Sequence, residues 1–145
     1  MSLTNLTPEN IPSVSIDFMN QTHMEEVEIV NSLMKKVNIR LSGEQNDTEI
    51  SRQLKVWFEH TQAHFARENE LMQKTAFPAY PVHSGEHENT LKLMQTVIDD
   101  WHRNKDIDRL QNYVFNLWPN WFMTHVNSMD KVTAEYALMN GYTEE

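Results

Sequence analysis

The chain contains no cysteine among its 145 residues. This absence excludes disulfide bonds, iron–sulfur clusters and zinc-finger sites, and it leaves only nitrogen and oxygen side chains as ligands for a metal. Glycine is also scarce, with three copies, and most of the five prolines lie at the edges of long segments. The interiors of these segments are therefore free to form continuous secondary structure.

Long apolar runs and an excess of positive charge are also missing. No segment approaches the roughly 18 apolar residues of a membrane-spanning helix, and Met1 to Asn20 lack the basic start and apolar centre of a secretory leader. We therefore expect a cytoplasmic protein with no membrane partner. The formal net charge of −9 argues against a nucleic-acid partner, because phosphates would be repelled. No protein partner is indicated by the sequence.

Apolar residues recur at three- and four-residue spacings, which predicts helices throughout. We expect an N-terminal arm over 1–17 and helices over about 18–39, 48–75, 83–103 and 106–139. Pro78 and Pro81 predict a turn before the third helix, and Pro119 predicts a kink, or two helices meeting near Trp118, in the last. Four long helices with short loops predict one all-α domain over 1–145, an antiparallel up-and-down four-helix bundle.

Histidines and carboxylates form four short motifs, one on each predicted helix. In chain order the members are His23, His64, Glu68, His83, His87, His125 and Asp130. Residues four apart share one face of a helix, roughly 6 Å apart along the axis, and the longer offset from His125 to Asp130 is still within reach of a flexible carboxylate. A single pair arises often by chance, but four in succession predict a metal site in the bundle core.

The residues alone leave the identity of the metal open. The Glu-x-x-His pairs of the bundle di-iron oxidases are absent, and so is the zincin pattern, because His87-Glu88 is followed by Asn-Thr-Leu. Neutral imidazoles bind zinc, copper and manganese as well as iron.

With these motifs the chain resembles the hemerythrins, specifically the single-domain bacterial form called bacteriohemerythrin, whose signature is His, then HxxxE, HxxxH and HxxxxD. The resemblance also includes the Phe77–Tyr80 turn, Trp121 before His125 and Lys131 after Asp130, and it covers essentially the whole chain.

This resemblance implies two iron ions with an oxo or hydroxo bridge, and reversible dioxygen binding by a carrier, store or sensor instead of an enzyme. It implies that one iron is bound by His83, His87 and His125, the other by His23 and His64, with Glu68 and Asp130 bridging both. One iron would then keep an open position. Two ferrous ions, two carboxylates and a hydroxide sum to one positive charge, and this sum is unchanged by the uptake of dioxygen, which suits an apolar pocket.

One departure from the family keeps a second function open. Glu26 stands three residues after His23, where the family usually has a leucine lining the oxygen pocket. If Glu26 points inward, it would bind the open iron position or supply protons, which favours a redox enzyme that reduces peroxide, dioxygen or nitric oxide. If it points outward, nothing changes. A weaker third reading is iron storage, or a metal that only stabilises the fold.

Four residues are candidates for the pocket or for contacts behind the ligands: Glu26, His60, Trp121 and Phe122. His60 lies one turn before His64 on the same helix face, where a purely structural role is the more common one. The four tryptophans and nine methionines are expected mainly in the core, as is usual for such residues at helical spacing.

Overall fold

The computed structural model describes residues 6–144, so residues 1–5 of the expected arm and Glu145 lie outside it. Three long helices come first: α1 (Asp17–Leu41), α2 (Asp47–Lys74) and α3 (Tyr80–Asn104). The fourth arm is a succession of α4 (Ile107–Asn112), η2 (Tyr113–Leu117), α5 (Trp118–His125), η3 (Val126–Asp130) and α6 (Lys131–Met139). A short 3-10 turn, η1 (Pro8–Asn10), precedes them, and residues 6–144 contain no strand.

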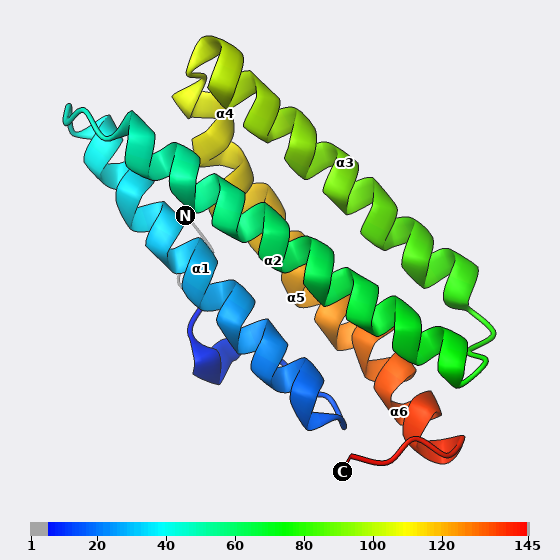
Figure 1. Ribbon diagram of the computed structural model, residues 1–145. Helices are drawn as coiled ribbons and strands as arrows, with labels where there is room; N and C mark the ends of the chain where they lie inside the picture. Colours follow the sequence, from blue (N-terminus) through cyan, green and yellow to red (C-terminus); the bar gives the residue numbers. More distant parts are fainter. Residues whose placement is uncertain (1–5, 145) are drawn as a thin grey trace.

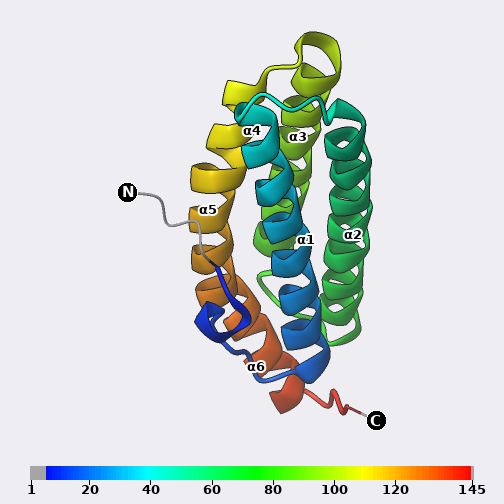
Figure 2. The ribbon, with the colours of Figure 1, turned by 90° about the vertical axis from the view of Figure 1, so that its left-hand side faces the viewer.

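These four arms form an antiparallel up-and-down bundle, as the sequence predicted. Helix α1 packs against α2, α2 against α3 and α3 against α4, and the fourth arm returns to α1. Figure 1 shows α1, α2 and α3 running side by side with the fourth arm behind them. In Figure 2 the bundle is seen from another side, with the N-terminal segment lying along the outside of the fourth arm. Successive arms are joined by short loops, which is the geometry expected for antiparallel neighbours.

The helix ends follow local backbone chemistry. Helix α1 ends where Gly43 takes a φ of 109°, a conformation that a residue without a Cβ adopts at little cost. Helix α3 begins at Tyr80, three residues earlier than expected. The reason is that Pro81 lies in the first turn of that helix, where its missing N–H would have had no helical partner.

The fourth arm accommodates its proline without a break. Residues 113–117, just before Pro119, form a π-helical segment in which the Trp118 N–H donates to the Tyr113 carbonyl, five residues back. A second π-helical segment, η3, has the Lys131 N–H donating to the Val126 carbonyl. The predicted irregularity near Trp118 is therefore one wide turn in a continuous helical arm.

The bundle core is apolar over most of its length. Trp57, Trp101 and Trp118 are among its largest fully buried side chains. Valine, leucine, isoleucine and methionine from all four arms fill the rest. Within residues 6–144, no helix combines the length and the apolar character needed to cross a membrane. Against this apolar background, a compact group of buried polar side chains is the exception that requires a partner.

Candidate metal centre

The seven predicted ligand side chains come together inside the bundle. They form two overlapping groups whose potential ligand atoms lie within 4.8 Å of one another. The first group consists of Glu68, His83, His87, His125 and Asp130, and the second of His23, His64, Glu68 and Asp130. Every member is at most 5% exposed. The two carboxylates are shared, so the structure contains two adjacent donor sets, one with three imidazoles and one with two.

The inner atoms of this cluster converge, and several of them form no hydrogen bond. His23 Nε2 lies 3.0 Å from Asp130 Oδ2, and His87 Nε2 lies 3.1 Å from Glu68 Oε1. None of these four atoms has a hydrogen-bond partner among the described residues. His83 Nε2 and His125 Nε2 are within hydrogen-bond distance of each other, at 3.1 Å. Converging nitrogen and oxygen atoms of which several lack hydrogen bonds are the arrangement expected of ligands around a cation.

The position of Asp130 depends on the π-helical segment η3, which begins directly after His125. In a regular α-helix a residue five positions on would be rotated by about 140° from His125. The wider turn of η3, with hydrogen bonds spanning five residues, brings Asp130 back over His125. The result is that His125 Nε2 lies 3.2 Å from Asp130 Oδ1. Backbone geometry, and not only the flexibility of the carboxylate, therefore aligns the pair.

Four of the five imidazoles are oriented through their outer nitrogens. His83 Nδ1 pairs with Thr133 Oγ1 at 2.8 Å, and His87 Nδ1 pairs with Asn69 Oδ1 at 2.9 Å. These contacts fix each ring and leave Nε2 free to face the centre. The remaining two pairs, each with a carboxylate, are His125 Nδ1 with Glu86 Oε1 at 2.7 Å and His64 Nδ1 with Glu26 Oε1 at 3.3 Å.

The exception is His23, whose Nδ1 has no hydrogen-bond partner among the described residues. Asn20 lies one turn earlier on the same helix, but its side-chain amide pairs with the backbone N–H and carbonyl of Val14. It thereby holds the N-terminal segment against α1 and does not reach His23.

The electrostatics of the cluster favour ionised carboxylates. Burial alone would raise the pKa of Glu68, but the charge of His64 and the imidazoles around it hold that pKa well below its usual range. Burial and the charge of Glu68 likewise act to raise the pKa of Asp130, but hydrogen bonds with the neighbouring imidazoles hold that pKa below its usual range. Two buried negative charges therefore sit among nitrogen donors, and a cation between them would supply the missing positive charge.

Aromatic rings enclose the donor sets. Phe65 stacks on His87 at 4.0 Å between centroids, and Trp121 stacks on His125 at 4.6 Å. Phe122 meets His23 edge-on at 5.6 Å. The sequence had singled out Trp121 and Phe122 as pocket candidates, and the structure places both against predicted ligands. These contacts restrict ring rotation and keep water away from the cluster.

Glu26 points inward, but it does not face the space between the donor sets. Its carboxylate accepts hydrogen bonds from Trp57 Nε1 and Thr61 Oγ1, and it pairs with His60 Nδ1, each at 2.7 Å. It belongs to neither donor group. An inward Glu26 was expected to bind the open metal position or to supply protons. Its oxygens are held behind His64 and outside both donor groups, which disfavours direct binding and leaves the supply of protons as a prediction.

Several contact residues were not identified from the sequence: Glu86, Asn69, Thr133, Trp57 and Thr61. Glu86 and Asn69 stand directly beside predicted ligands in the chain, but each pairs with a histidine from another helix. A single sequence contains no signal for such contacts between helices. Trp57 was expected as plain core; it is fully buried, yet it also donates a hydrogen bond to Glu26.

Comparison with known proteins agrees with this geometry. The family model described as the hemerythrin HHE cation binding domain matches residues 14–137. The chain belongs to the hemerythrin family. A bacteriohemerythrin of Aquifex aeolicus is 29% identical over 130 residues, which is 90% of this chain and 95% of that protein. A bacteriohemerythrin of Ralstonia nicotianae is 34% identical over 89 residues, or 61% of this chain and 63% of that protein.

The fold agrees with solved hemerythrins as well. A wild-type hemerythrin crystal structure matches with a TM-score of 0.79 at 20% identity, covering 93% of this chain and 98% of that chain. At this identity the likeness shows the hemerythrin fold. The metal-binding character of the chain rests on the family and on the buried cluster together.

Proposed function

We propose that this chain binds dioxygen reversibly at a non-haem di-iron centre. The observation that supports this function most directly is the asymmetry of the two donor sets. In this assignment His83, His87 and His125 would hold one iron, His23 and His64 would hold the other, and Glu68 and Asp130 would be shared by both. The iron with two imidazoles would have fewer protein ligands and so would keep the position where dioxygen enters. An oxo or hydroxo bridge completes the pair.

The donor chemistry fits iron. Five imidazoles and two carboxylates offer only nitrogen and oxygen, which suits ferrous and ferric ions. The three-to-two division of imidazoles would make one iron saturated and leave the other open, which is a useful arrangement for binding one small ligand. The relatives named bacteriohemerythrin support the same choice. A single domain over 1–145, a cytoplasmic location and the lack of a nucleic-acid partner stay predictions.

A redox enzyme is the second candidate, and Glu26 is the observation that favours it. A buried negative charge behind His64 stabilises the more positive, oxidised state of a nearby metal. In that reading the site reduces peroxide, dioxygen or nitric oxide and does not hold dioxygen for release.

The visible absorption spectrum of iron-loaded protein separates these functions. The protein is reduced fully without air, exposed to dioxygen and then purged with inert gas. A coloured adduct that disappears on purging and returns with dioxygen is the result we expect. Immediate and irreversible conversion to a ferric form would instead support the redox enzyme. A protein that takes up iron but shows no reaction with dioxygen would contradict both.

A further inference from the structure

Glu26 is a buried carboxylate that contacts a predicted ligand without belonging to either donor set. We propose that Glu26 is the positioning residue for His64 and that its charge shifts the two-imidazole half of the site toward the oxidised metal. This inference rests on the proposed di-iron function and deepens it, because it names the residue that sets the redox balance at the open iron. In this role Glu26 acts only through His64.

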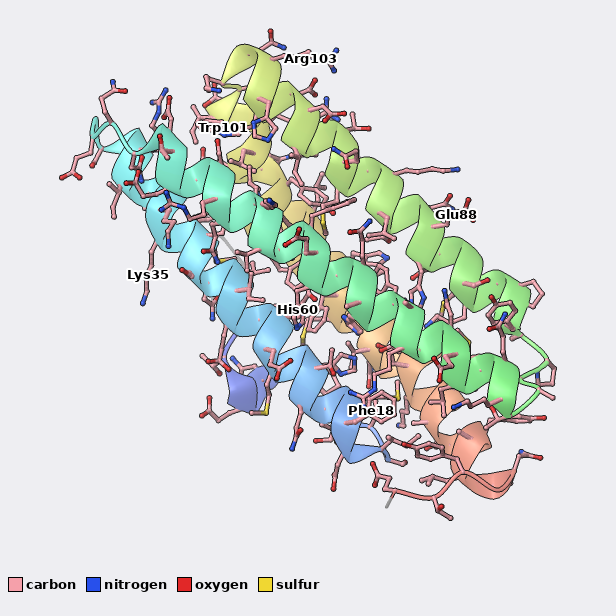
Figure 3. The ribbon with its side chains drawn as sticks, viewed as in Figure 1. Phe18, Lys35, His60, Glu88, Trp101 and Arg103 are labelled. Carbon is pink, nitrogen blue, oxygen red and sulfur yellow. The ribbon has the colours of Figure 1, made fainter. Side chains whose placement is uncertain are left out.

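The Glu26 carboxylate is buried and held by its neighbours. It is 1% exposed, and four partners surround it: Trp57, His60, Thr61 and His64. All four lie on α2, whereas Glu26 comes from α1. Figure 3 shows the labelled His60 between these two helices. The carboxylate therefore links α1 to α2 at the level of the candidate metal centre.

One carboxylate oxygen of Glu26 faces the outer nitrogen of His64. Oε1 of Glu26 lies 3.3 Å from His64 Nδ1, while His64 Nε2 faces the donor set, 2.8 Å from Glu68 Oε2. An acceptor at Nδ1 keeps the proton on that nitrogen and leaves the Nε2 lone pair for a metal. A carboxylate does this more strongly than a neutral group, and it raises the basicity of the ring.

Glu26 differs from the other side chains that pair with the outer nitrogens of the imidazoles. His83 and His87 pair with the neutral side chains of Thr133 and Asn69. Glu86, which pairs with His125, has a side chain that is 33% exposed, so water screens its charge. Glu26 is the buried carboxylate among these partners, and it lies on the two-imidazole side. Its charge therefore acts most strongly on the metal that is proposed to bind dioxygen.

The residues behind Glu26 are arranged to hold it in place. Trp57 is fully buried and packs against Tyr113 and Trp118, with ring centroids 5.8 Å and 5.7 Å away. Its indole N–H therefore cannot turn to water if Glu26 is removed. Thr61 is 1% exposed and its hydroxyl donates to the same carboxylate oxygen as Trp57. Such a fixed set of donors keeps the charge at one distance from His64.

Glu26→Gln is the variant that tests this role, because it keeps the shape and a hydrogen-bond acceptor but removes the charge. Glu25→Gln is the matched control: the neighbouring side chain is 64% exposed and loses the same charge. Competition with a chelator for redox-silent Zn²⁺ should show that Glu26→Gln weakens one of the two metal equivalents by about 10- to 100-fold. The other equivalent, and both equivalents in Glu25→Gln, should stay within about twofold of the parent protein.

The second readout is the reduction potential of the iron-loaded protein. Glu26→Gln should move it in the positive direction, by about 59 mV for each tenfold change in the one-electron equilibrium. Thr61→Val, which loosens Glu26 but keeps its charge, should weaken zinc binding slightly and leave the potential unchanged. If the role of Glu26 were purely structural, Glu26→Gln would lower the melting temperature. Its zinc affinity and its reduction potential would then match those of Glu25→Gln.

The outcomes also separate this inference from the function it rests on. If the parent protein binds two equivalents and Glu26→Gln matches Glu25→Gln in affinity and potential, the role of Glu26 is overturned and the di-iron function stands. If the parent protein binds fewer than two equivalents, the di-iron function itself is overturned, and the inference with it. Weaker binding of one equivalent together with a positive shift of the reduction potential, seen in Glu26→Gln alone, supports both.

Discussion

At the scale of single residues, Glu26 should govern how the metal-free protein responds to acid. Burial alone would raise its pKa, but hydrogen bonds from His60 and His64 lower it from 4.5 to about 2. A carboxyl group whose folded pKa is depressed stabilises the fold above its unfolded pKa. That contribution is lost as the pH falls from about 4.5 toward about 2.

Urea unfolding of metal-free protein checks this prediction. The difference in free energy of unfolding between the parent protein and Glu26→Gln should be largest at pH 5.5 and should shrink at pH 3. Both proteins must be compared without metal, since bound metal would hold the network together at either pH. A difference that is constant between the two pH values would show that Glu26 has an ordinary pKa.

At the scale of elements, the π-helical segment η3 should control whether the site forms. Inserting one alanine directly after Asn127, an exposed residue inside it, should place Asp130 six positions after His125 and rotate its side chain away from His125 by about 100°. We expect the insertion variant to keep its helical circular dichroism but to lose stoichiometric metal binding. Asn127→Ala preserves the five-residue spacing and is the control. Retention of two metal equivalents after the insertion would contradict the proposed role of η3 in aligning Asp130 with His125.

The elements were largely predictable from the sequence, but their irregularities were not. Apolar spacing gave four helical arms in the right order, and short loops gave their antiparallel arrangement. From the sequence, the longer offset between His125 and Asp130 was assigned to a flexible carboxylate, whereas in the structure the backbone makes up the extra residue. The hydrogen bonds that decide it, such as Lys131 to Val126, exist only in the folded helix.

The candidate metal centre, too, could be predicted from the sequence only in part. The pairs His64/Glu68 and His83/His87 could be predicted because their members lie four residues apart on one regular helix, where they share a face. The supporting contacts could not, because His83 with Thr133 and His64 with Glu26 join residues 50 and 38 positions apart. Glu26 illustrates the limit: the sequence shows an unexpected charge near His23, but only the fold shows that it contacts α2 and lies outside both donor sets.

At the scale of the whole molecule, metal removal should destabilise the bundle. The cluster buries Glu68 and Asp130 together with five imidazoles, and several of their atoms have no hydrogen-bond partner among the described residues. Breaking up a buried set of charges commonly costs about 3–5 kcal/mol. For a chain of this size this lowers the melting temperature by on the order of 10 °C.

Differential scanning calorimetry of iron-loaded and metal-free protein measures this effect. Readdition of ferrous iron without air should restore the melting temperature, which distinguishes metal loss from irreversible damage. Equal melting temperatures with and without metal would mean that the cluster does not hold an ion in the folded protein.

The sharing of Glu68 and Asp130 between the two donor sets has a consequence for how damage to the site would spread. The loss of either carboxylate would remove a ligand from both sets at once, whereas the loss of one imidazole would remove a ligand only from the set to which it belongs. A chain altered at a histidine would therefore keep one intact set, and a chain altered at a shared carboxylate would keep none.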